Sequence, residues 1–236
     1  MGLFLDANIA EKFMIKGVLK MPFKFLGQDV WITDSILSMC LICLILIVFA
    51  IICSVYIKKA KLVPVGFQNF IEMVVELIDN MVKGTLGDNA IRFRNYIGTI
   101  FVFILLANLS GLIGLRAPTA DYGVTLPLGV FTFIIIQFQG FKNNGINNFL
   151  DLFKPTPLLF PINIIGEVTT PITLSLRLFA NLLSGVIIMG LWYGMIPLLF
   201  RLGLPTFLHA YCDLFSGCIQ AYVFSMLTMV YVSQKL

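Results

Sequence analysis

Long runs of apolar residues constrain this chain more than any other feature. A helix needs about 20 apolar residues to cross the hydrocarbon core of a membrane, and five stretches approach or exceed that length. They cover about residues 36–57, 96–115, 124–141, 158–199 and 204–232. Only 12% of the residues are charged and 59% are hydrophobic, whereas a soluble domain carries about 25% charged residues. We therefore expect an all-α polytopic membrane protein with about five transmembrane helices.

The residues outside these runs predict surface helices and polar loops. Lysines recur every four residues within residues 1–35, which favours an N-terminal arm that lies as a helix in the membrane interface. An arm without regular structure is the alternative. Residues 62–85 place acidic residues on one side and apolar residues on the other, so we expect an amphipathic helix along the surface that does not cross. The polar stretch 142–157 belongs outside the lipid.

The later runs predict a hairpin followed by two long helices. Residues 96–141 hold two spans joined by the Pro-, Asp- and Gly-containing loop 116–123, which indicates a transmembrane hairpin. Within residues 158–234, the segment 158–199 would measure about 60 Å as one helix, against a hydrocarbon core of about 30 Å. It must tilt, run partly along the interface or bend, and Pro171 offers a bending point.

The distribution of basic residues predicts the orientation. Five crossings place the carboxyl-terminal end opposite the amino-terminal arm. If the carboxyl-terminal end is cytoplasmic, nine basic residues lie on that side and six on the outer side, which the positive-inside rule favours. The cytoplasmic set is Lys58, Lys59, Lys61, Lys83, Arg92, Arg94, Lys142, Lys154 and Lys235. The outer set is Lys12, Lys16, Lys20, Lys24, Arg116 and Arg201.

Three ionisable residues lie within the apolar runs: Glu167, Arg177 and Asp213. A charge in the middle of the bilayer costs at least about 2.5–3.5 kcal/mol, so such residues face water or each other and mark ion or substrate pathways. Arg177 belongs to a polar stripe at helical spacing, whose members are Thr170, Thr173, Arg177, Asn181 and Ser184. The stripe predicts a hydrated or protein-facing groove; a structural arginine bonded to a neighbouring helix is the alternative.

The other two ionisable residues have two interpretations each. Glu167 lies about 15 Å before Arg177 along a helix, so it is either a carboxylate in a water channel or an interfacial residue. In the final run, His209, Asp213 and Gln220 share a helix face. They form either a proton-conducting line or a pair that joins two helices. The chain has one His and no third metal ligand near it.

Several chemical classes are not expected. The chain lacks a zinc-protease motif and a Gly-rich phosphate loop, and its basic residues are scattered rather than arranged for nucleic acid. We give the five cysteines no metal or disulfide role, because three lie in one apolar run where Cys is a small hydrophobe. We expect no cofactor, no metal and no nucleic-acid partner.

Five stretches carry a family resemblance. Residues 170–181 read TPITLSLRLFAN, residues 160–167 read FPINIIGE, and residues 220–231 read QAYVFSMLTMVY. Residues 107–109 (ANL) and 118–121 (PTAD) lie in the hairpin. Taken in chain order, and with a match that runs from about residue 36 onward, these stretches resemble subunit a of the F-type ATP synthase. That subunit is the membrane stator of an ion-driven rotor.

The resemblance implies roles for the ionisable residues. It implies that Arg177 faces the essential carboxylate of a rotating ring of c subunits, between two offset aqueous half-channels. Glu167 and Asn163 match positions of the cytoplasmic half-channel, and Asp213 and Gln220 match positions of the outer one. Arg keeps its proton throughout the accessible pH range, so its charge would favour the ionised ring carboxylate and repel cations between the half-channels. We also assign Thr173, Asn181 and Asn108 to the ion pathway.

Two positions depart from the family pattern. Val186 stands where many members have an acid or His, nine residues after the arginine, and Asp213 stands where others have His or Glu. We therefore expect ions to enter through Asp213 with help from His209, one helical turn earlier.

The resemblance also implies partners and a location. They are the c-subunit ring, the peripheral-stalk b subunits, the remaining F1Fo subunits and the lipid bilayer, with ATP chemistry on partner subunits. We expect a bacterial plasma membrane, with an organelle inner membrane as the alternative. The coupling ion is H+ or Na+. The rival functions are a stand-alone ion channel or a secondary carrier, although a carrier's internal repeat is not visible.

Overall fold

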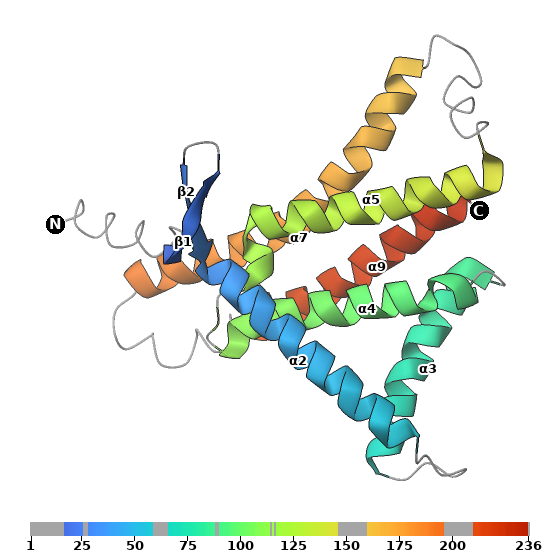
Figure 1. Ribbon diagram of the computed structural model, residues 1–236, viewed down its shortest axis with the longest axis horizontal. Helices are drawn as coiled ribbons and strands as arrows, with labels where there is room; N and C mark the ends of the chain where they lie inside the picture. Colours follow the sequence, from blue (N-terminus) through green and yellow to red (C-terminus); the bar gives the residue numbers. More distant parts are fainter. Residues whose placement is uncertain are drawn as a thin grey trace.

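The computed structural model describes residues 17–25, 28–58, 66–87, 90–113, 115, 117–145, 160–195 and 210–235. In chain order the elements are β1 (Gly17–Phe25), β2 (Gln28–Thr33), α2 (Asp34–Ile57), α3 (Phe67–Leu86), α4 (Ala90–Leu109), η2 (Ser110–Ile113), η3 (Pro118–Ala120), α5 (Tyr122–Asn144), α7 (Phe160–Met195), η7 (Ala210–Phe215) and α9 (Ser216–Gln234). Figure 1 shows α4, α5, α7 and α9 gathered into one bundle, with α2 and α3 on one side of it.

Within the described residues, five helices are long and apolar enough to cross a membrane. They are Asp34–Ile57, Ile91–Ile113, Tyr122–Asn143, Phe160–Trp192 and Tyr211–Gln234. The expected polytopic membrane architecture with five α-helical spans is confirmed, and each span overlaps one of the five apolar runs. The amphipathic helix appears as α3 and is not among the five; its place at the membrane surface stays a prediction.

The expected interfacial helix in the amino-terminal arm is wrong for residues 17–33. These residues form an antiparallel hairpin in which Lys20 pairs with Trp31 and Lys24 with Asp29. Pro22 lies inside β1 and is incompatible with a helix interior, and β2 is rich in the β-branched and aromatic residues that strands favour. Residues 1–16, with Lys12 and Lys16, lie outside the described residues.

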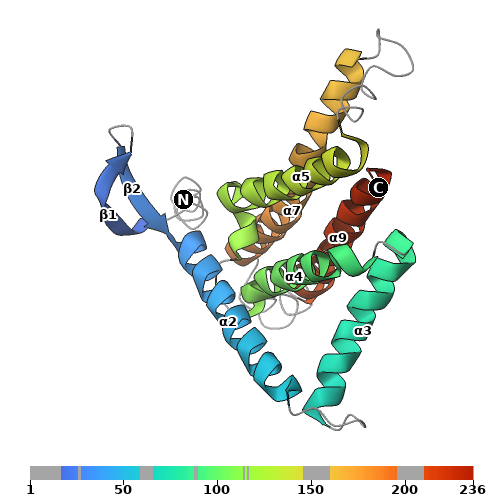
Figure 2. The same cartoon turned by 45° about the vertical axis from the view of Figure 1, so that its right-hand side comes forward.

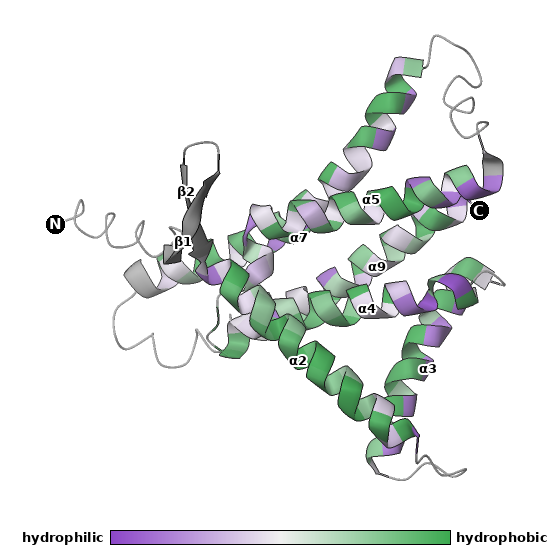
Figure 3. Cartoon of the chain, viewed as in Figure 1, coloured by the Kyte–Doolittle hydropathy of each residue, from purple (hydrophilic) through white to green (hydrophobic). Residues whose placement is uncertain are grey.

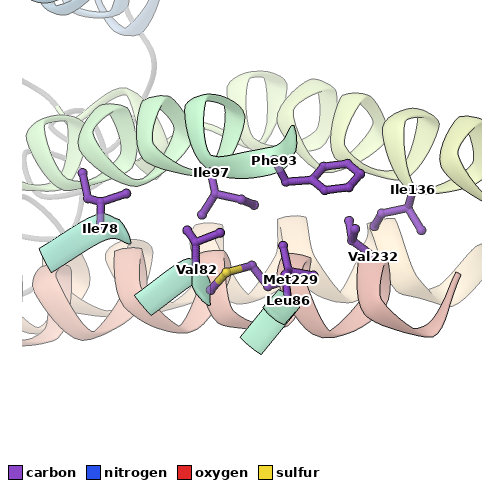
Figure 4. Packing of buried hydrophobic residues seen from close by; sticks show 8 residues of the cluster. All are labelled: Ile78, Val82, Leu86, Phe93, Ile97, Ile136, Met229 and Val232. Atoms are coloured by element: carbon purple, nitrogen blue, oxygen red, sulfur yellow. The ribbon is translucent and has the colours of Figure 1, made fainter. Parts of the chain in front are cut away.

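The bundle closes around apolar side chains from five helices. One cluster joins α3, α4, α5 and α9, as Figure 4 shows, through Ile78, Val82, Leu86, Phe93, Ile97, Ile136, Met229 and Val232. A second cluster joins α4, α7 and α9 through Ile100, Ile104, Leu174, Leu178, Ala221 and Phe224. Because α4 and α9 both contribute to the two clusters, they form the centre of the described core.

Helix α7 is the longest element, with 36 residues and Pro171 in its interior. Figure 1 shows that it changes direction, with its amino-terminal part turned away from α5. A proline removes one backbone hydrogen bond and so permits a bend. At the same level α5 approaches closely: a Cβ atom added to Gly129 would lie 2.7 Å from the Pro171 carbonyl oxygen. The absence of a side chain at Gly129 is what allows this contact.

Helix α2 is mostly uncovered by the rest of the chain. Only 11% of its apolar window is buried, and the buried residues Ser35, Ser38 and Ile42 all lie in its first turns. Residues of α2 are apolar at nearly every position, and Figure 3 shows the visible side of the helix as hydrophobic along almost its whole length. Such a helix is typically surrounded by lipid or by other membrane helices. Figure 2 shows α2 and α3 converging away from the bundle, where Tyr56 and Phe67 place their ring centroids 5.5 Å apart.

Candidate functional site

Helix α7 presents one buried face and one uncovered face. The buried face packs into the bundle through Leu174, Leu178, Leu182 and Met189. The uncovered face is formed by exposed residues that recur every three or four positions over most of the helix. Its members are Ile162, Ile165, Thr169, Thr173, Leu176, Ala180, Ser184, Ile187 and Leu191. A stripe of this length on a membrane helix needs lipid or another protein against it.

Arg177 lies in the middle of this uncovered face. Its side chain is exposed, and it forms no hydrogen bond or ion pair with any residue that the structure describes. An arginine in a membrane span pairs with another group or faces water. The group or water that faces the Arg177 guanidinium is therefore not among the residues that the structure describes. Of the predicted polar stripe, Thr173 and Ser184 are exposed with Arg177, while Thr170 and Asn181 are half-buried.

Glu167 is surrounded by partners from two other helices. Lys235, directly after α9, places its Nζ atom 2.6 Å from Glu167 Oε1, and Gln137 of α5 donates from Nε2 to Oε2 at 2.8 Å. Asn143, in the last turn of α5, donates to the backbone carbonyl of Lys235 at 3.3 Å. We call these four side chains, Gln137, Asn143, Glu167 and Lys235, the Glu167 clasp.

Two further polar contacts fasten α9 to its neighbours. Ser216 donates to Asn181 Oδ1 at 2.9 Å, which turns Asn181 toward α9. Asn108 is fully buried; its Nδ2 donates to the Gly217 carbonyl at 3.0 Å, and its Oδ1 accepts from Thr119 Oγ1 at 2.9 Å. Asn108 therefore joins α4, η3 and α9.

The remaining predicted residues lie at both ends of the bundle. Asn163 is half-buried in the first turns of α7, one turn before Glu167. Asp213 is half-buried in η7, where a Cβ atom added to Gly111 would lie 3.7 Å from Asp213 Cγ. Gln220 is buried, and its Nε2 atom has no hydrogen-bond partner among the described residues. His209 lies outside the described residues.

The geometry of η7 changes the spacing argument for the last span. This segment is a π-helix, whose turns are wider than those of an α-helix and which often occurs at functional sites. The 3.6-residue spacing applied to Asp213 and Gln220 therefore holds only from Ser216 onward. Within the part of the chain that the structure describes, no group of three or more His, Cys, Asp or Glu side chains is arranged to hold a metal ion.

The structure brings in residues that the sequence reasoning missed. Gln137, Ser216 and Lys235 contact predicted site residues, and Gly111 borders Asp213. Gln137 is a polar residue within an apolar run, which was the one available signal. From the sequence alone, Lys235 is only one of the basic residues that predict the orientation.

Comparison with known proteins identifies what this arrangement resembles. Residues 36–233 match the model of the family described as ATP synthase A chain. A curated relative from Propionigenium modestum, named ATP synthase subunit a, sodium ion specific, is 37% identical over 192 residues, which are 74% of this chain and 65% of that protein. The aligned stretch is therefore less than two thirds of that relative's length.

Two other relatives are matched over more of their length. The ATP synthase subunit a of Sulfurihydrogenibium sp. (strain YO3AOP1) is 35% identical over 194 residues, covering 80% of this chain and 91% of the relative. The ATP synthase subunit a of Moorella thermoacetica is 35% identical over 178 residues, covering 75% of this chain and 79% of the relative.

Proposed function

The chain belongs to the ATP synthase A chain family, and from this premise we propose that it is the stator subunit a of the Fo motor of an F-type ATP synthase. In this role it carries coupling ions to and from carboxylates on a rotating ring of c subunits. Rotation then couples ion flow to ATP synthesis, and the nucleotide chemistry takes place on partner subunits. The chain itself is a non-catalytic membrane subunit.

The observation that carries this proposal is the exposed guanidinium of Arg177, which has no partner among the residues that the structure describes. A cation in this position favours a facing surface that bears a carboxylate, because an opposite charge stabilises the ionised form of both groups. The apolar residues on the same face would pack against that surface. A carboxylate that passes Arg177 would lose its bound cation there, since the arginine competes with the cation and keeps its own proton.

Two routes to the Arg177 face complete the proposal. Glu167 and Asn163 would line the cytoplasmic route. Asp213, with help from His209, and Gln220 would line the outer route, and the unpartnered amide nitrogen of buried Gln220 supports a polar path there. Val186 is exposed on α7 and supplies no ionisable group to this route. Thr173 and Asn181 flank Arg177 on α7, whereas Asn108 uses both ends of its amide in bonds that suit a positioning role.

The proposed setting follows from the family. The chain assembles with other ATP synthase subunits; the c ring and the peripheral-stalk b subunits are the partners we propose for its membrane surface. The reported relatives come from bacteria, which supports a multi-pass location in a bacterial plasma membrane. The coupling ion is H+ or Na+, and the sodium specificity belongs to the Propionigenium modestum relative by name.

The test is ATP-driven ion uptake by inverted membrane vesicles that contain the Arg177→Ala complex. Proton uptake is followed by dye quenching and sodium uptake by tracer, and passive leak is measured after F1 is removed. We expect assembly to be retained and uptake of the coupling ion to be lost. The matched control is Arg92→Ala, which removes an exposed arginine of α4 outside the site and should leave uptake unchanged. Normal, tightly coupled uptake by the Arg177→Ala complex would overturn the proposal.

A further inference from the structure

The Glu167 clasp occupies both oxygens of a carboxylate inside the membrane protein. Oε1 lies 2.6 Å from the Lys235 ammonium, and Oε2 accepts a hydrogen bond of 2.8 Å from Gln137. The Glu167 and Lys235 side chains are only 28% and 21% exposed, so the pair is partly shielded from water. An ionised donor and acceptor at this distance form a charge-assisted hydrogen bond, which is stronger than a neutral one. A cation that approaches Glu167 therefore meets a carboxylate already neutralised by this chain.

Lys235 directly follows α9, and the residues before it differ in their burial. Val232 is fully buried in the core, whereas Ser233 and Gln234 are exposed. The Lys235 backbone N–H donates to the Val232 carbonyl at 3.0 Å. The Lys235 carbonyl accepts from Asn143 of α5, and Gln139 donates to Asn143 Oδ1 at 3.0 Å. Release of Lys235 from Glu167 would therefore involve the residues after Val232 and the bond from Asn143.

We propose that Lys235 is a tethered cation that competes with the coupling cation for the Glu167 carboxylate. This inference rests on the proposed function, in which ions pass Glu167, and it adds a positioning residue to that pathway. With Lys235 engaged, Glu167 is closed to a transported cation. When the segment after Val232 moves away from Glu167, the carboxylate becomes free to bind the coupling cation. The fraction of time that Lys235 is bound to Glu167 therefore sets the cation concentration needed for transport on this side of the membrane.

The decisive measurement is the half-saturating concentration of the coupling cation for ATP-driven uptake into inverted vesicles. Na+ is titrated at fixed pH if the complex carries Na+, and the external pH is varied if it carries H+. We expect Lys235→Gln to lower the half-saturating concentration about threefold to tenfold, because the internal competitor is gone. Lys235→Arg keeps the charge and should stay close to the unmodified protein. Lys142→Gln is the matched control, since Lys142 is exposed at the end of α5, and should change nothing.

A second measurement does not depend on the variants' folding. A water-soluble carbodiimide joins an adjacent carboxylate and amine directly, so in the unmodified complex it should yield an amide between Glu167 and Lys235 that mass spectrometry detects. An absent cross-link, or a half-saturating concentration that is equal in Lys235→Gln and Lys142→Gln, would overturn the inference. If the inference about Lys235 fails but Arg177→Ala abolishes uptake, the proposed function still stands. If Arg177→Ala leaves uptake normal, the proposed function itself has failed.

Discussion

Arg177 and Glu167 lie ten residues apart on the same helix, yet their surroundings are opposite. Arg177 is exposed on the uncovered face of α7 and has no partner among the described residues. Glu167 is bonded to Lys235 and Gln137, from two other helices. Both charges belong to an apolar span, where an unpaired charge is costly. One charge is neutralised by described residues of this chain, and the other has no partner among them.

This difference indicates that two charges on one helix have separate roles, one in holding helices together and one in function. The partnered charge holds α5, α7 and the end of α9 together, so its effects on stability and transport are internal to the chain. The charge of Arg177 has no partner among the described residues, so its substitution should affect function and leave the fold intact. The predictions below test that separation, beginning with the largest expected effect.

Reversal of the Arg177 charge should have the largest effect on ion uptake. In Arg177→Glu the facing carboxylate would meet a like charge instead of a cation, and like charges in one site strongly oppose ionisation of both groups. We expect coupled uptake to fall below detection, while the amount of subunit a in the membrane is unchanged. Arg92→Glu reverses an exposed arginine away from the site and serves as the control. Substantial coupled uptake by Arg177→Glu would remove the distinction between the two charges.

Asp213→Asn should cripple transport almost as strongly. The substitution keeps the size of the side chain beside Gly111. It removes the carboxylate, which is the ionisable group of η7 that we assign to the outer route. We expect ATP-driven uptake to fall at least about tenfold, which corresponds to about 1.4 kcal/mol in the barrier. Uptake and complex content are measured on the same vesicles. Near-normal pumping would show that the outer route does not depend on Asp213.

Asn108→Ala should affect stability more than the charge substitutions do. It leaves the Thr119 hydroxyl and the Gly217 carbonyl without the bonds that they now form in a buried site, and such a loss costs about 1–3 kcal/mol. The measurement is thermal unfolding of the purified complex in detergent, with Asn80→Ala at an exposed position of α3 as the control. Equal unfolding temperatures for the two variants would contradict the joining role of Asn108.

The smallest effect should come from the ion pair between Arg94 and Asp79. Its atoms are 3.2 Å apart, and the Arg94 side chain is 45% exposed, so water screens the attraction and Arg94→Ala should cost less than about 1 kcal/mol. Thermal unfolding is again the measurement, with Lys235→Gln measured beside it. A larger loss in Arg94→Ala than in Lys235→Gln would mean that the Glu167 clasp is no stronger than an exposed pair.

The sequence was sufficient to predict the spans and the exposed arginine. Hydrophobic length alone defines a membrane helix, because the bilayer thickness sets it, and the spacing around Arg177 placed Thr173 and Ser184 on its side of one helix. These features depend only on residues close together in the chain. The helix expected in residues 17–33 failed because the lysine spacing was given more weight than Pro22 and the β-forming residues of β2.

The Glu167 clasp and the π-helix could not be predicted in the same way. Glu167 is 30 residues from Gln137 and 68 from Lys235, and periodicity along one helix carries no information about which neighbouring helix it meets. Asp213 of the π-helix η7 lies beside Gly111, 102 residues earlier in the chain. Such contacts arise from the arrangement of helices, which local spacing does not determine.

The central position of α9 has a consequence for how the protein is made. Asn108 of α4 is synthesised more than a hundred residues before Gly217, the α9 residue to which it donates, and both apolar clusters also need α9. While the nascent chain is inserted span by span, the Asn108 amide nitrogen must therefore wait in the bilayer without its acceptor, although Thr119 already bonds to the other end of the same amide. The arrival of the last helix both satisfies this nitrogen and completes the two apolar clusters.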